Sequence, residues 1–147
     1  MILKMILGKG ARGLLSYISN PTKTNHNHTQ PFFSNMAGQT ARELSKEVAV
    51  LRRLKPNLKM AVAHLVLSHD PNDRPLTKAE WRHAISTALK THGAEEAAFC
   101  SYLHLDTNHI HTHVFTCESC PVGRQSAIRI PTEKMRLLHA SSKRSSN

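Results

Sequence analysis

A predicted β-hairpin in the second half of the chain constrains the fold more than any other feature of the sequence. Residues 97–105 and 109–117 each have the length and the apolar, aromatic and β-branched composition of a strand, and a three-residue turn, Asp-Thr-Asn, separates them. A connection this short joins antiparallel strands, because a parallel pair needs a crossover of a dozen or more residues. The sequence therefore predicts an antiparallel sheet that contains this hairpin.

The segments before the hairpin supply further strands and helices. Strands are predicted at 1–7 and 59–68, helices at 11–19, 40–54 and 77–92, and a long loop at 21–37. The last helix begins at a capping box, because Thr77 stands three residues before Glu80. The order strand, helix, helix, strand, helix, hairpin predicts an α+β fold, an antiparallel sheet with helices on one face and the opposite face free for a ligand.

The charge of the chain favours a polyanion as its partner. Lys and Arg number 20 against 10 Asp and Glu among 147 residues, which gives a net charge of +10 with neutral His. No apolar stretch approaches the roughly 20 residues that span a bilayer, and the apolar run at 1–7 is too short for a secretory signal. Three Cys do not make a disulfide framework. These features predict a cytoplasmic protein without membrane insertion.

Histidines gather in the hairpin. The sequence has eleven, and four of them fall within ten positions. Alternate side chains of a strand share a face, so His109, His111 and His113 point the same way, and His104 on the partner strand can reach that face. Three imidazoles that converge from two paired strands form a rigid metal site with open coordination positions, as in catalytic metal centres. The alternative, packed or solvated histidines, would cluster several titratable rings with no gain.

A second pair of residues has metal-ligand spacing. Cys117 and Cys120 are separated by two residues, which is the spacing of half a zinc site. The chain has no second Cys pair, so the histidine cluster is the metal site that the sequence favours.

The histidine motif occurs with two others in a fixed order. The motif runs from His104 through Asp106 and ends in His-x-His-x-His; before it come a helix with Tyr17 and a strand that ends in Leu-Ser at Ser68. This set resembles the His-hydrophobic-His relaxases of plasmid mobilisation and the related nicking protein of T-DNA transfer, and the resemblance covers residues 1–116. It implies a relaxase-like fold with an RRM or ferredoxin-like core. It also implies metal-dependent, site- and strand-specific nicking of single-stranded DNA by tyrosine transesterification.

The resemblance assigns roles to individual residues. It implies Tyr17 as the nucleophile, Ser68 beside the DNA backbone, and a divalent cation, Mg²⁺ or Mn²⁺, as cofactor. The implied metal ligands are His104, His111 and His113. Asp106 is a candidate catalytic residue that either accepts the N–H of an imidazole or holds the turn. Tyr102 is the rival nucleophile, and the role of His109 stays open.

Cationic and aromatic side chains are candidate contacts to single-stranded DNA. The candidate phosphate contacts are Arg52, Arg53 and Lys55. A basic helix face is more often only solvated, which is the alternative for these three. Phe32 and Phe33 in the long loop are candidate stacking partners for bases, whereas His64 and His69 are predicted to be structural. The resemblance implies as partners single-stranded DNA at a transfer origin, accessory mobilisation proteins and a coupling protein.

The C-terminal segment has a different character from the rest. Residues 117–147 are basic and rich in Ser without apolar periodicity, and they are predicted to form an irregular, disordered tail after a relaxase domain at 1–116. Relaxases continue well beyond the histidine motif, so the domain is predicted to be incomplete at its C-terminus. A change of reading frame near Thr116 and a natural DNA-binding tail are the two explanations for this composition.

Two other functions compete with an active relaxase. The first is an inactive truncated remnant that acts at most as a metal-containing module for binding single-stranded DNA. The second is a rolling-circle replication initiator or a single-strand transposase, which also joins a histidine pair to a tyrosine. In those proteins the tyrosine typically follows the histidines, whereas Tyr17 precedes them. The order of the motifs therefore favours the relaxase over the second alternative.

Overall fold

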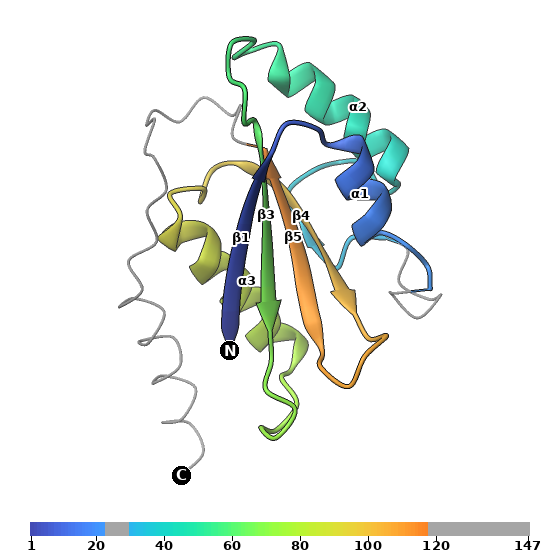
Figure 1. The fold of residues 1–147 in the computed structure, drawn as a ribbon, viewed down its shortest axis with the longest axis vertical. Helices are drawn as coiled ribbons and strands as arrows, with labels where there is room; N and C mark the ends of the chain where they lie inside the picture. The colour runs from blue at the N-terminus through green and yellow to red at the C-terminus, as the bar shows by residue number, and fades with distance from the viewer. Residues whose placement is uncertain (23–29, 118–147) are drawn as a thin grey trace.

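A five-stranded antiparallel sheet forms the centre of the fold in the computed structural model, which describes residues 1–22 and 30–117. The strands lie in the order β1-β3-β5-β4-β2 (Figure 1). They are β1 (Ile2–Gly8), β2 (Phe33–Ser34), β3 (Val62–Ser68), β4 (Ala98–His104) and β5 (His111–Cys117). The helices are α1 (Arg12–Ile18), α2 (Ala41–Arg52) and α3 (Lys78–Thr91). The α+β class and the antiparallel sheet are as predicted from the sequence.

The predicted hairpin is the pair of strands β4 and β5. Its register places His104 opposite His111, so residues 105–110 connect the strands. The connection is longer than the three residues predicted, because the second strand begins at His111. His109 therefore lies in the connection and outside the alternation of β5.

Strand β2 is an element that the sequence did not predict. It has two residues, lies inside the predicted loop at 21–37, and pairs with β4, where Phe33 is opposite Ser101. A strand this short has no alternation to detect. Only the pairing with β4 identifies these two residues as a strand.

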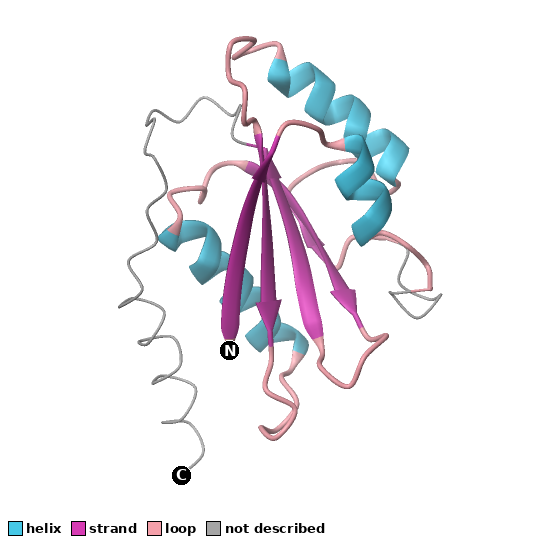
Figure 2. Ribbon diagram, viewed as in Figure 1, coloured by secondary structure: helices cyan, strands magenta, loops and turns pink. Residues whose placement is uncertain are grey.

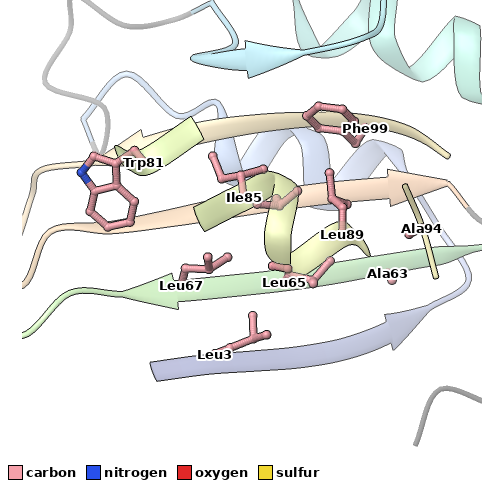
Figure 3. Close-up of a cluster of buried hydrophobic side chains, with 11 residues drawn as sticks. Leu3, Ala63, Leu65, Leu67, Trp81, Ile85, Leu89, Ala94 and Phe99 are labelled. Carbon is pink, nitrogen blue, oxygen red and sulfur yellow. The ribbon is translucent and has the colours of Figure 1, made fainter. Parts of the chain in front are cut away.

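Helices lie on both faces of the sheet, and not on one face as predicted. Helix α3 packs on one face, where Trp81 and Ile85 join a buried cluster with Leu65 of β3 (Figure 3). Helices α1 and α2 contribute Leu15 and Leu44 to a second buried cluster on the other face. Figure 2 shows α3 behind the strands and the other two helices at the upper right.

The two faces of β3 are covered to different extents. Its apolar run is nearly continuous, and alternate residues of a strand go to opposite faces. Leu65 and Leu67 belong to the cluster beneath α3, whereas Val62 belongs to the cluster beneath α1 and α2. The face beneath α3 is therefore fully covered, whereas on the other face only Val62 is buried and His64, Val66 and Ser68 are half-buried.

Helices α1 and α2 cover only part of their face. The strand residues in their cluster are Val62, Ala98, Cys100, Tyr102, Phe115 and Cys117. On the rest of this face, Ile2 and Ile6 of β1 are 70% and 48% exposed. His111 and His113 alternate in step with Phe115, so they lie on this face too. The part of this face that α1 and α2 leave uncovered is therefore the open surface on which a ligand is predicted to bind.

The capping box predicted for α3 is confirmed. The hydroxyl of Thr77 accepts a hydrogen bond from the N–H of Glu80 at 3.2 Å, and the Glu80 carboxylate accepts one from the N–H of Thr77 at 2.8 Å.

Thr77→Ala is expected to lower the free energy of unfolding by about 1 kcal/mol, because it leaves a helix N–H without its acceptor. Urea denaturation followed by circular dichroism measures the loss. The control Ser86→Ala, at an exposed position of the same helix, should stay within about 0.5 kcal/mol of the parent; equal losses would contradict the role of the cap.

The predicted tail lies almost entirely outside the described residues, which end at Cys117, and Cys120 lies outside them too. The domain boundary at 116 and the disorder beyond it therefore stay predictions. Cys117 itself is a buried free thiol at the end of β5. None of the helices in the described part of the chain is long and apolar enough to cross a membrane.

Candidate active site

Three histidines converge at one end of the β4–β5 pair. His104 ends β4 opposite His111, the first residue of β5, and His113 follows on the same face. Each ring offers one nitrogen that lies within 4.8 Å of the nitrogens offered by the other two. His104 and His113 are buried, and His111 is half-buried. The structure thus brings the three predicted metal ligands together, and it leaves exposed His109 out of the group.

Hydrogen bonds to two of these rings fix which nitrogen carries the proton. His104 donates from Nε2 to the carbonyl of Ile18 at 2.7 Å, and His111 donates from Nδ1 to the carbonyl of His109 at 2.8 Å. A carbonyl oxygen only accepts, and a neutral imidazole has one N–H. The lone pairs therefore lie on Nδ1 of His104 and on Nε2 of His111, the arrangement that metal-binding histidines require.

The third ring, that of His113, contacts His64 in β3. Its Nδ1 lies 2.7 Å from Nε2 of His64, and the two ring planes are 24° apart. Ligation by His113 would then use Nε2, which is buried. Three imidazole donors in this arrangement fit a divalent transition metal with open positions better than Mg²⁺, whose preferred ligands are oxygens.

His64 is a site residue that sequence reasoning missed, since it was predicted to be structural. Burial lowers the pKa of His64 below its ordinary value, which favours the neutral ring near pH 7. A signal for its position was present. His64 stands four residues before Ser68 in the same strand, so the two side chains share the face of the metal ligands.

The structural prediction for His69 agrees with its surroundings. Its Nε2 donates to the carbonyl of Arg74 at 2.8 Å, and its ring packs edge-on against Trp81 of α3 at a centroid distance of 6.2 Å. His69 is therefore engaged on the side of the sheet opposite the histidine cluster.

Tyr17 lies against the histidine cluster. Its ring centroid is 5.7 Å from that of His113 and 6.3 Å from that of His104, with edge-on geometry in both pairs. The side chain is 46% exposed. The next residue, Ile18, provides the carbonyl that holds His104, so the last turn of α1 positions both the tyrosine and one of the histidines.

Tyr102, the rival nucleophile, is in a different environment. It is opposite His113 in the β4–β5 register and shares the face of the cluster, as predicted. It is only 1% exposed, because it belongs to the core beneath α1 and α2. Burial raises the pKa of its hydroxyl far above the ordinary value. A buried phenol that resists ionisation is a poor nucleophile.

Two further predicted residues are near the histidines, one in the sheet and one in the sequence. Ser68 ends β3 directly opposite His111 and is half-buried. Asp106 is exposed in the connection between β4 and β5, two residues after His104. Ser68 is therefore adjacent to a predicted metal ligand in the sheet, and the catalytic role of Asp106 stays a prediction.

The predicted basic contacts lie toward the other end of the sheet. Arg52 ends α2, and Arg53 and Lys55 follow it on the way into β3. Figure 1 shows this end of α2 at the top of the molecule, where β3 begins, whereas Ser68 ends β3 lower down. A strand of seven residues is about 20 Å long at roughly 3.3 Å per residue. DNA that contacts both regions would have to span that distance, and the contacts themselves stay predictions.

The two aromatic residues proposed to stack on bases face away from the site. Phe33 packs edge-on against Phe99 at a centroid distance of 5.1 Å, and Phe32 and Phe33 both pack against the core beneath α3. The guanidinium of Arg82 lies 5.8 Å from each ring centroid. These rings are engaged on the opposite face, so they do not stack on bases at the histidine cluster.

Comparison with known proteins defines the class of nuclease to which this fold and site correspond. The sequence model of the family described as Relaxase: MobA/VirD2-like, nuclease domain matches residues 17–143. The chain belongs to this family, which confirms the resemblance drawn from its motifs.

A solved structure has a similar fold. The structure of the MobM Relaxase Domain (MOBV; Mob_Pre) bound to 26nt pMV158 oriT DNA matches with a TM-score of 0.54 and 15% sequence identity, over 98% of this chain and 84% of that one. At this identity the likeness concerns the fold alone. A sequence search among curated proteins finds no significant match.

Proposed function

We propose that this protein is a DNA relaxase that nicks single-stranded DNA at a transfer origin by metal-dependent tyrosine transesterification. The observation that carries the proposal is the position of Tyr17, whose ring packs against a cluster of three histidines with metal-ligand geometry. An exposed phenol beside a cation site is the arrangement that phosphoryl transfer to tyrosine needs.

The ligands of the metal would be Nδ1 of His104 and Nε2 of His111 and of His113. A divalent ion held there, Mn²⁺ or Mg²⁺, supplies charge that stabilises the phosphate oxygens in the transition state. Of these two ions, the imidazole donors favour Mn²⁺. Asp106 is proposed to support the site by accepting an imidazole N–H or by holding the connection.

The reaction at Tyr17 exchanges one phosphate ester for another. The phenolic oxygen bonds to phosphorus, and the bond from phosphorus to the 3′ oxygen of the preceding nucleotide breaks. The phenolic proton is balanced by the proton that the released 3′ hydroxyl gains. The products are a 5′-phosphotyrosine and a free 3′ end, and since no ester bond is lost, the strand can be rejoined.

The proposed substrate is consistent with the charge of the protein and with its relative. The net charge of +10 favours a polyanion, and the similar solved relaxase domain is bound to oriT DNA. Ser68, in register with His111, is proposed to contact the DNA backbone, with Arg52, Arg53 and Lys55 as more distant phosphate contacts. Accessory mobilisation proteins, a coupling protein and a cytoplasmic location complete the proposal.

The test is the capture of a covalent intermediate. The whole chain is incubated with a library of single-stranded oligonucleotides and Mn²⁺ or Mg²⁺, and products are separated on a denaturing gel. A protein–DNA adduct that EDTA prevents is the expected result. Oligonucleotide binding without any adduct would instead support the inactive remnant, a metal-containing binding module.

Oligonucleotide affinity is expected to fall steeply with salt, because cations of the protein displace counterions from the phosphates. The expected log–log slope is roughly −0.7 for each phosphate neutralised on a single strand. Fluorescence anisotropy with a labelled oligonucleotide at several salt concentrations measures it. A flat response would contradict the polyanion interpretation of the net charge.

A further inference from the structure

We infer that His64 is a positioning residue for the metal site: it accepts the Nδ1–H of His113 and so fixes that ring as an Nε2 ligand. The inference rests on the proposed metal site and names a residue that acts on it through a ligand. It assigns a role to a histidine on β3, a strand that carries none of the three ligands.

The sheet places His64 within reach of His113. Strands β3 and β5 are neighbours, and their register pairs Val66 with His113 and His64 with Phe115. His64 is therefore the diagonal neighbour of His113 on the same face, a separation that long and aromatic side chains bridge. The two rings meet with Nε2 of His64 at 2.7 Å from Nδ1 of His113.

The chemistry of this contact allows two arrangements, and only one is compatible with ligation. Two neutral imidazoles share a single N–H between the facing nitrogens. If His64 donated, the proton of His113 would sit on Nε2 and block its lone pair. If His113 donates from Nδ1, its Nε2 is available to a metal. Metal binding therefore selects the arrangement in which His64 is the acceptor.

The other two ligands show the same principle with different partners. His104 is held by the carbonyl of Ile18, and His111 by the carbonyl of His109. Both of these acceptors are backbone atoms, which a substitution cannot remove. The second nitrogen of His113 meets a side chain, so substitution of His64 makes this part of the site testable.

The experiment measures Mn²⁺ binding to the whole, metal-free chain by calorimetry. His64→Ala is expected to weaken Mn²⁺ binding by about 10- to 100-fold, the usual effect of removing the partner of a metal-binding histidine. His64→Gln, whose side-chain oxygen can accept the same N–H, should recover most of the affinity. His69→Gln, a change at the histidine of the opposite face, should leave the affinity within about threefold of the parent.

Thermal unfolding of each variant separates positioning from folding. A His64→Ala protein that is folded and binds Mn²⁺ like the parent would overturn the inference. So would a His64→Gln protein that is as weak as His64→Ala, because the acceptor would then not matter. If His64→Ala does not fold, the comparison of His64→Gln with a folded His64→Leu decides in the same way.

One more variant keeps this inference apart from the proposed metal site. His111→Ala removes a ligand and should abolish Mn²⁺ binding whatever the role of His64. If His111→Ala loses the metal and His64→Ala does not, the proposed metal site is supported and only the role of His64 is refuted. If the parent chain binds no Mn²⁺, both the proposed metal site and the inference about His64 are wrong.

Discussion

Replacement of Tyr17 by Phe is expected to abolish the covalent protein–DNA adduct, with a loss of at least roughly 1,000-fold, because the substitution deletes the one oxygen that forms the new phosphate ester. Metal binding should be unchanged, since the three imidazoles remain and their hydrogen bonds to Ile18, His109 and His64 do not involve the phenolic oxygen. Oligonucleotide binding should persist too, because the ring remains against His104 and His113. Denaturing gel electrophoresis measures the adduct, and calorimetry measures the metal.

Tyr102→Phe is the matched control for this loss. Tyr102 lies on the same face but in the core, with its hydroxyl buried, so its removal should leave the adduct intact. The reverse outcome, in which Tyr102→Phe loses the adduct and Tyr17→Phe keeps it, would move the nucleophile to β4. Loss of metal binding in Tyr17→Phe would show that the hydroxyl of Tyr17 supports the metal site and is not only the nucleophile.

His111→Ala is expected to weaken binding of Mn²⁺ by at least about 100-fold, because removal of a direct ligand should cost more than the 10- to 100-fold typical of an outer partner. His111 is the most accessible ligand, as the other two are buried, so its truncation disturbs the core least. Calorimetry on the metal-free chain measures the loss, and the adduct should disappear with the metal.

His109→Ala provides a matched control in the same motif. The His109 side chain is exposed and lies outside the triad, whereas its backbone carbonyl holds His111 and survives the substitution. This variant should bind Mn²⁺ like the parent. Metal loss in His109→Ala together with retention in His111→Ala would refute the ligand assignment.

The hairpin and the histidine cluster were predictable because both follow from local rules. Alternation in a strand places His111 and His113 on one face, and pairing brings His104 to the same face, whatever the rest of the fold does. The length of the connection was not predictable in the same way. The sequence of residues 105–110 is compatible with several turn types. In the structure the connection is longer than predicted and includes His109.

Long-range placement depended on the resemblance or escaped prediction. No local pattern connects Tyr17 with His104, and their proximity comes from the docking of α1 on the sheet. Helix α3 covers the fully apolar face of β3, where Ala63, Leu65 and Leu67 are buried, and alternation in the strand shows that these residues share a face. His64 was overlooked because a single histidine in an apolar strand has no local partner; its partner, His113, is far along the chain.

A capping box was predicted at the start of α3 but not at the start of α2, although both helices have one. Thr40 and Glu43 have the same spacing as the pair that begins α3, and in the structure they form a capping box at the start of α2. The predicted start of that helix was nevertheless accurate, because its apolar periodicity was clear. A cap and a periodic face are independent signals, and for α2 the periodic face alone predicted the start.

The short helix α1 depends on the sheet for its order. With seven residues and no side-chain cap, it falls below the roughly 12–15 residues at which an isolated helix becomes marginal in water, so burial of Leu15 and Ile18 holds it in place. Its bond to His104 makes docking of the helix and orientation of that imidazole a single event. By reciprocity of linked equilibria, a cation that favours the oriented ring also favours the docked helix, and a helix that detaches releases the tyrosine and loosens the cation together.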